Sequence, residues 1–84
     1  MVYAVVLHPT VVAFLQKLPR PVSERIKAKL CDLREEPFRY LERLKGVAGY
    51  KLRIGDYRAL VDIDEAARVI YIQVLDHRGR IYKR

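Results

Sequence analysis

The sequence lacks most of the residues on which common enzyme chemistry depends. It has one cysteine, Cys31, and one serine, Ser23, among 84 residues. A single cysteine cannot form an internal disulfide, and in a small domain it more often fills a helix position than acts as a nucleophile. A Ser-His-Asp triad is implausible with only one serine. There is no glycine-rich phosphate loop, zinc-binding Cys/His cluster or Mg²⁺-binding set of carboxylates in the sequence, so we expect no metal and no cofactor.

Long hydrophobic runs are also missing. No stretch is long enough to span a membrane, and the apolar start Val2–Leu7 is too short for the core of a signal peptide. A single cysteine fits a reducing compartment, so we expect a cytoplasmic protein without membrane association. With 84 residues, of which 51% are hydrophobic, the sequence predicts one globular domain over residues 1–84.

Basic residues exceed acidic residues and are unevenly distributed. The chain holds 17 Lys and Arg against 10 Asp and Glu, which gives a formal net charge of +7. Residues 43–84 contain 10 of the basic residues but only 5 of the acidic ones. This excess indicates a polyanionic partner, a nucleic acid or an acidic protein, and composition alone does not distinguish the two.

The most informative stretch is residues 50–58, Tyr-Lys-Leu-Arg-Ile-Gly-Asp-Tyr-Arg. It predicts two strands joined by a two-residue turn at Gly55-Asp56, where positive φ values are accessible. Counting outward from the turn, Arg53 faces Arg58, and alternation puts Lys51 on the same face. Like charges directly opposed on a sheet cost roughly 0.2–1 kcal/mol per pair. Three cations with no carboxylate among them therefore suit an anion-binding surface, and a solvated face of a basic protein is the alternative.

Hydrophobic periodicity predicts the other elements. In chain order these are a strand over Val2–His8, helices over residues 9–18 and 21–36, a candidate short strand over Leu44–Val47, the hairpin, a turn over residues 64–67 and a central strand over Val69–Leu75. His8, beside Pro9, is expected to be a strand end or helix cap. The predicted fold is α+β in the order β-α-α-β-β-β. A two-helix hairpin covers one face of a curved, mainly antiparallel sheet, and the other face carries the cations.

One reaction is well suited to cations, tyrosine and at most one histidine, namely the cleavage of RNA by its own 2′-hydroxyl group. The substrate supplies the nucleophile, so the protein orients it, stabilises the added negative charge on the phosphorane and transfers two protons. Arginine suits that charge through bidentate contacts with phosphate. A lysine whose pKa is lowered by neighbouring arginines suits a base, and tyrosine or histidine suits an acid or a stacking surface. DNA lacks the 2′-hydroxyl and would not be cleaved in this way.

The sequence also resembles a known family. The segments Tyr50–Arg53, Gly55–Arg58, Val74–Arg78 and Ile81-Tyr82 are similar, in this order, to RelE toxins of the RelE/ParE superfamily. The resemblance covers nearly the whole chain, including Leu44-Lys45-Gly46. It implies a RelE-like toxin of a type II toxin–antitoxin system, an mRNA interferase that acts on the ribosome and cleaves A-site mRNA without a metal. It also implies inhibition by a RelB-like antitoxin in a hetero-oligomer.

The resemblance assigns catalytic roles to five residues. Lys51 contacts or activates the substrate, and Arg58 stabilises the phosphate. Arg78 is an acid or charge stabiliser, and Tyr82 stacks on a base or assists proton transfer. Arg53 stands where the bacterial archetype has a lysine, and because arginine is not deprotonated in proteins, it cannot be the base. Further RNA contacts are expected at His77, Arg80, Lys83, Arg84 and Lys45, and His77 is also a candidate acid.

Two other functions remain open. A ParE-like inhibitor of DNA gyrase would share the fold, lack catalysis and bind a protein target. A basic RNA-binding module would block translation without cleavage. The combination of Lys51, Arg53, Arg58, Arg78 and Tyr82 favours the endoribonuclease, since a gyrase inhibitor has no need of phosphate-transfer residues. Binding and cleavage of RNA use the same side chains, so the sequence does not separate the first reading from the third.

Overall fold

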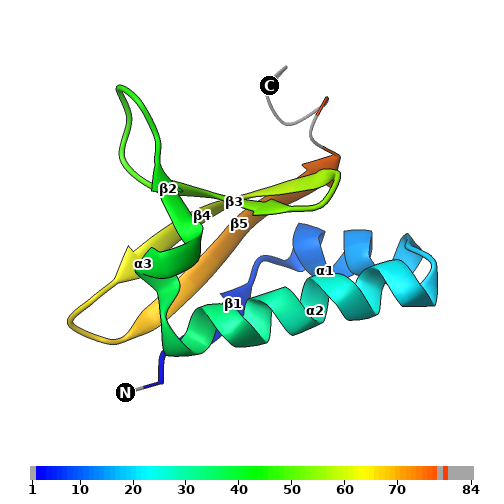
Figure 1. Ribbon diagram of the computed structural model, residues 1–84, viewed down its shortest axis with the longest axis horizontal. Helices are drawn as coiled ribbons and strands as arrows, with labels where there is room; N and C mark the ends of the chain where they lie inside the picture. Colours follow the sequence, from blue (N-terminus) through cyan, green and yellow to red (C-terminus); the bar gives the residue numbers. More distant parts are fainter. Residues whose placement is uncertain (1, 78, 80–84) are drawn as a thin grey trace.

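The computed structural model describes residues 2–77 and 79 and has a helical layer on one face of a five-stranded sheet (Figure 1). The elements are β1 (Ala4–Leu7), α1 (Pro9–Lys17), α2 (Arg20–Glu35), α3 (Pro37–Tyr40), β2 (Leu41–Arg43), β3 (Tyr50–Ile54), β4 (Tyr57–Asp64) and β5 (Val69–His77). This confirms the predicted α+β class. It adds α3 and β2 to the predicted order of elements.

The strand order across the sheet is β1-β5-β4-β3-β2. β1 runs parallel to β5, and the other neighbouring pairs are antiparallel. β5 thus lies inside the sheet, as its hydrophobicity predicted, and its Ile70 and Ile72 are buried. A register shift at Leu60/Val61 interrupts the pairing of β4 with β5, and such irregularities increase local twist.

Prolines and a histidine set the helix boundaries. The ring Nδ1 of His8 accepts a hydrogen bond of 3.2 Å from the backbone N–H of Thr10, which makes His8 the N-cap of α1, as predicted. Pro19 is the N-cap of α2, and Pro37 follows the end of α2 and begins α3. Cys31 is an exposed helix residue. No helix within the described residues is long and apolar enough to cross a bilayer.

The hydrophobic core lies between the helices and the sheet. Apolar side chains of α1 and α2 pack against alternate residues of β3, β4 and β5, and together with Tyr3 they form one buried cluster. Its members are Tyr3, Val11, Leu15, Ile26, Leu30, Leu33, Leu52, Ile54, Ala59, Val61, Ile70, Ile72 and Leu75. Among the described elements, no helix lies over the opposite face of the sheet (Figure 1), so the strand residues between the core positions point away from the helices.

The candidate strand over Leu44–Val47 is wrong. The strand before the hairpin is β2, which ends at Arg43, and residues 44–49 form a loop that projects from the sheet away from the helices (Figure 1). The backbone N–H of Leu44 closes this loop by donating to the Gly49 carbonyl at 3.1 Å. At the end of the loop, Gly49 has φ +108°, which is not a strand conformation, and a Cβ there would stand 3.2 Å from Asp62 Oδ1, so the turn back into β3 requires glycine.

Candidate functional site

The helix-free face of the sheet presents the predicted cations in two cross-strand rows. One row consists of Arg53, Arg58 and Asp76, and the other of Glu42, Lys51, Leu60 and Val74. The predicted pairing of Arg53 with Arg58 is confirmed. The turn between them has Gly55 at φ +57°, whereas Asp56 is not among the positive-φ residues. Glycine at the first central position is typical of a type II′ hairpin turn.

The hairpin turn itself holds the guanidinium of Arg58. Nη1 donates hydrogen bonds to two backbone carbonyls, that of Gly55 at 2.9 Å and that of Tyr57 at 2.8 Å. An arginine has five N–H groups. The Nε and Nη2 groups of Arg58 have no hydrogen-bond partner among the residues that the structure describes. The turn therefore fixes one side of the guanidinium and leaves a fork of donors that can bind a phosphate.

The expectation that no carboxylate stands among the cations is wrong. Glu42 is the cross-strand partner of Lys51, and its Oε2 lies 3.5 Å from Lys51 Nζ. Asp76 is the partner of Arg58 in β5 and is only 6% exposed, with Oδ1 accepting a 2.7 Å hydrogen bond from the His77 backbone N–H. Both carboxylates come from neighbouring strands, so the two-stranded hairpin alone could not reveal them.

The structure does not bring all predicted residues to this face. The ring of His77 packs edge-on against Tyr57 at 5.5 Å between centroids, and Tyr57 contacts Phe14 of α1 in the same way at 6.0 Å. His77 therefore lies on the helix-covered side. Lys45 is exposed in the loop between β2 and β3. Five predicted residues lie outside the described residues, namely Arg78, Arg80, Tyr82, Lys83 and Arg84.

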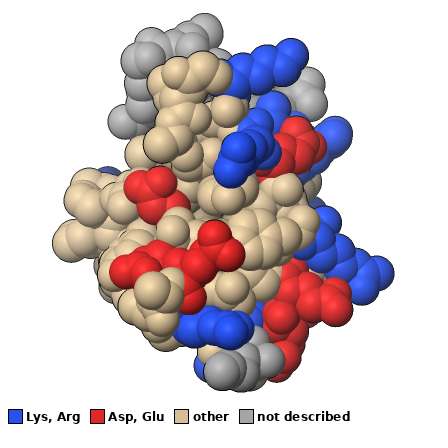
Figure 2. Space-filling view, turned by 90° about the vertical axis from the view of Figure 1, so that its left-hand side faces the viewer, with Lys and Arg blue, Asp and Glu red and all other residues tan. Residues whose placement is uncertain are grey.

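On the side of the molecule that Figure 2 presents, charge is mixed rather than collected in one uniform patch. Figure 2 shows Lys and Arg interspersed with Asp and Glu on the side of the molecule that it presents. At Arg39, a hydrogen bond from the guanidinium to Glu36, 3.1 Å long, raises the pKa above its ordinary value, with smaller contributions from Tyr40 and from the Glu36 charge. This exposed group lies outside the two rows. The local geometry of the rows, more than the net charge, therefore defines the candidate site.

In the described part of the chain, no three His, Cys, Asp or Glu side chains are placed to hold a metal ion together. The residues that sequence reasoning missed are Glu42 and Asp76. The missed signal for Asp76 was alternation along β5, because a residue next to the buried Leu75 must face the cations. Glu42 had no comparable signal, since the strand before the hairpin was expected at Leu44–Val47.

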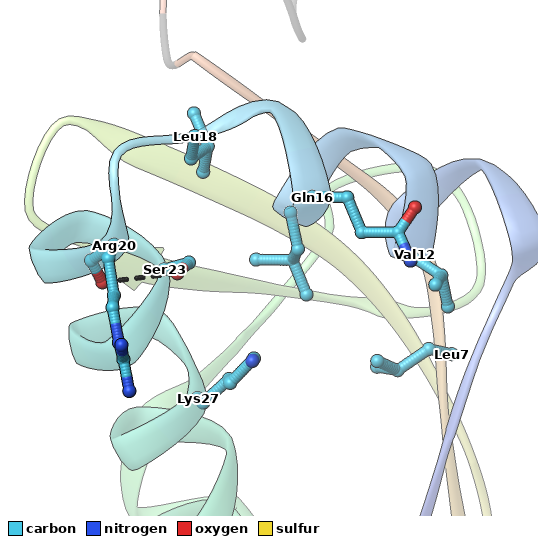
Figure 3. Close-up of a pocket in the computed structure, with 8 residues that line it drawn as sticks. Leu7, Val12, Gln16, Leu18, Arg20, Ser23 and Lys27 are labelled. Carbon is cyan, nitrogen blue, oxygen red and sulfur yellow. Dashed lines mark hydrogen bonds between the residues drawn. The ribbon is translucent and has the colours of Figure 1, made fainter.

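A second surface is a groove between α1, α2 and the end of β1. Figure 3 shows Leu7, Val12 and Leu18 around it and the polar side chains of Arg20 and Lys27 on the α2 side. Leu15 and Gln16 also line the groove. The hydroxyl of Ser23 donates to the Arg20 carbonyl at 3.1 Å, which ties up that hydroxyl within the first turns of α2. The result is an apolar groove with a basic edge.

Of two comparisons with known proteins at the level of sequence, one identifies a family. A sequence profile of the family described as the ParE toxin of the type II toxin–antitoxin system parDE matches residues 5–82. A search of curated protein sequences finds no match.

Three solved structures show how far the similarity extends. The archaeal RelE–RelB complex from Pyrococcus horikoshii is 33% identical, with a TM-score of 0.82, over 95% of this chain and 99% of that chain. The toxin–antitoxin complex RelBE2 from Mycobacterium tuberculosis is 32% identical, with a TM-score of 0.79, over 93% and 100% of the two chains. A mutant of the E. coli toxin RelE in the free state is 23% identical over 99% and 93%, with a TM-score of 0.73, and shows the same fold.

Proposed function

The chain belongs to the ParE toxin family of type II toxin–antitoxin systems, within the RelE/ParE superfamily, and we propose that it is a ribosome-dependent mRNA endoribonuclease of the RelE kind. One observation carries the proposal. Arg58 is held by two turn carbonyls with its remaining donors unoccupied among the described residues, and Arg53 stands directly opposite. The identity above 30% to the RelE toxins of two solved complexes supports it.

In the proposed reaction the 2′-oxygen of one nucleotide attacks its own 3′-phosphorus. The O2′–P bond forms, the P–O5′ bond breaks, and the products are a 2′,3′-cyclic phosphate and a 5′-hydroxyl end. The proton leaves the 2′-hydroxyl and a proton is added to the departing 5′-oxygen. Arg58 and Arg53 would stabilise the negative charge that develops on the phosphorane. The nucleophile belongs to the substrate, and in this proposal the cationic side chains take the charge-stabilising role, so no step uses a metal.

The proton transfers are assigned to the remaining predicted residues. Lys51 lies in the neighbouring row and is half-buried, with Glu42 beside its ammonium group. It is our candidate for contacting or activating the 2′-hydroxyl. Arg78 and Tyr82, outside the described residues, are our candidates for charge stabilisation, proton donation or stacking on a base. Lys45 of the projecting loop is proposed to contact ribosomal RNA.

We further propose that the inhibitor is a RelB-like antitoxin and that it binds the groove of Figure 3. The solved relatives include a complex with RelB. An apolar groove with Arg20 and Lys27 at its edge suits an amphipathic helix with acidic flanks. Val12→Asp, at a 39% exposed position, should weaken antitoxin binding at least tenfold. Val47→Asp, 65% exposed on the projecting loop, is the control that should not, and equal effects would exclude the groove.

The second candidate function is the ParE-like one considered above, inhibition of DNA gyrase, and the match to the ParE toxin family is the reason to keep it. It would use the same fold in the cytoplasm without any catalysis. Primer extension on mRNA incubated with purified protein in EDTA, with and without translating ribosomes, separates the two. Codon-phased cuts that need ribosomes and leave cyclic phosphate ends support the endoribonuclease. Absence of cuts, together with impaired DNA supercoiling by gyrase, would replace it with the gyrase inhibitor.

A further inference from the structure

A shallow cleft lies between α2 and the turn that joins β3 to β4. Three cations line it, Arg25 and Lys29 from α2 and Arg53 from β3, together with Asp32 and Gly55. We propose that this cleft binds a second phosphodiester of the RNA, next to the one held by Arg58. This inference rests on the proposed function, because it extends the RNA path of the same site around the end of the sheet.

The sequence places these cations on one side of α2. Arg25, Lys29 and Asp32 are spaced at i, i+4 and i+7, a helical period that puts them on a common face. Next to them the buried Ile26 and Leu33 attach the helix to the core. The packing of α2 on the sheet thus fixes the position of this side of α2, which lines the cleft together with the tip of the hairpin.

The end of the sheet opens this cleft to Arg53. β2 pairs with β3 only as far as Leu52, so Arg53 lies beyond the last paired residue at that edge. Its side chain is exposed, and no strand of the described chain covers it from that side. Arg53 can therefore contact an anion in the cleft as well as one bound beside Arg58 on the helix-free face of the sheet.

Gly55 joins the cleft to the Arg58 site. Its carbonyl accepts the 2.9 Å hydrogen bond from Arg58. On the other side, Nη1 of Arg25 lies 3.5 Å from the point where a Cβ on Gly55 would stand. Two guanidinium groups from different elements thus approach the same turn residue, and a strand of RNA can follow them without leaving the protein surface.

Within the described part of the chain, no ion pair neutralises the cations of the cleft. Across residues 2–77 and 79, neither Arg25, Lys29 nor Arg53 takes part in an ion pair, although Asp32 lines the same cleft. The Nζ of Lys29 lies 4.0 Å from the centroid of the Tyr40 ring. This cation–π contact holds the ammonium in place and leaves its charge available. Converging cations repel one another, and a phosphate between them would remove that cost.

The test measures how binding of RNA depends on salt. The probe is a fluorescently labelled twelve-nucleotide RNA with 2′-O-methyl groups throughout, which cannot be cleaved. Each phosphate contact on a single strand contributes about 0.7 to the slope of log K against log salt. We expect Arg25→Gln/Lys29→Gln to reduce this slope by about 0.7 to 1.4, one or two contacts.

The matched control is Lys17→Gln/Arg68→Gln. It removes the same charge, one Lys and one Arg, and one of the pair again stands over a tyrosine, with Arg68 5.5 Å from the Tyr3 ring centroid. The control should leave the slope unchanged. Equal reductions in both double variants would overturn the proposal, because the cations would then act only through net charge. Arg25→Gln alone covers the case in which loss of the Lys29 contact to Tyr40 unfolds the protein.

Two further measurements place the phosphate and separate this inference from the proposed function. Binding to ribosomes without mRNA is compared with binding to the probe. A loss with the probe supports the proposal, and a loss with ribosomes alone overturns it, because the anion in the cleft would then belong to ribosomal RNA. If no mRNA is cut but the slopes still differ, the proposed function fails and the cleft stands. If cleavage is normal and the slopes are equal, the cleft fails and the function stands.

Discussion

The two faces of the sheet are built from the same strands and have opposite properties. On the helix-covered face, Leu52 and Ala59 are fully buried at 0% exposure. On the other face, their sequence neighbours Arg53 and Arg58 oppose each other as like charges. Successive side chains of a strand point to opposite faces. Within one hairpin, the buried residues therefore contribute to stability and their sequence neighbours to the proposed chemistry. A substitution on one face should change stability, and a substitution on the other should change cleavage.

The largest expected effect is on the buried face. Leu52→Ala removes a side chain with no exposed surface, which costs about 2–5 kcal/mol in such cavities. That is a large part of the stability of a domain, about 5–15 kcal/mol. Urea unfolding should show a lower midpoint with an unchanged slope. If Leu52→Ala abolished cleavage without changing the midpoint, the separation of the two faces would be wrong.

The corresponding change on the exposed face is Arg58→Ala. Loss of a group that stabilises developing charge lowers catalytic rates about 10²–10³-fold. Unfolding free energy should change by less than about 1 kcal/mol, since the lost hydrogen bonds join a half-buried side chain to an exposed turn. Ribosome-dependent cleavage and urea unfolding measure the two quantities. Arg58→Lys keeps the positive charge but lacks the fork of donors, so its cleavage rate should lie between that of the unsubstituted protein and that of Arg58→Ala. Full activity of Arg58→Ala would refute the assignment of the site.

Sequence predicted those parts of the fold that depend on residues close together in the chain. Hairpin pairing, the cap at His8 and the place of β5 inside the sheet depend on local spacing, turn chemistry and hydrophobicity, and all three agree with the structure. The strand β2 was missed because three residues, Leu41–Arg43, carry too little alternation to stand out. The predicted strand fell on the neighbouring loop, where positive-φ glycines fix a different path.

The candidate site was predictable only in part, for the same reason. The cations Lys51, Arg53 and Arg58 lie within one hairpin, so counting residues placed them together. Glu42 lies beside Lys51 because β2 pairs with β3 in that register. Arg25 lies beside the turn because α2 packs against the sheet. Both contacts depend on how separate elements meet in space. A pattern along one strand or helix contains no information about such contacts.

Asp76 tests where the separation of the two faces ends, because it lies in the cationic row and is nonetheless buried. Asp76→Asn keeps an acceptor for the His77 backbone N–H and removes the charge that faces Arg58. We expect unfolding free energy to fall by about 1–3 kcal/mol, and cleavage to fall less than in Arg58→Ala. Urea unfolding and cleavage measure both. An increase in stability would instead mean that the buried carboxylate destabilises the fold and that its contribution is to the site.

The smallest expected effect is that of Glu42→Gln, which removes the ion pair with Lys51. The two side chains are 67% and 36% exposed, and exposed pairs contribute about 0–1 kcal/mol, so stability should scarcely change. Removing a carboxylate from a phosphate-binding row should strengthen binding of the uncleavable RNA about two- to fivefold at low salt, since unit charges about 4 Å apart interact with about 1 kcal/mol in water. The gain should vanish at high salt because of screening. Weaker binding would show that Glu42 holds Lys51 in the position that RNA requires. RNA binding would then depend on the position of Lys51 as well as on the net charge of the row.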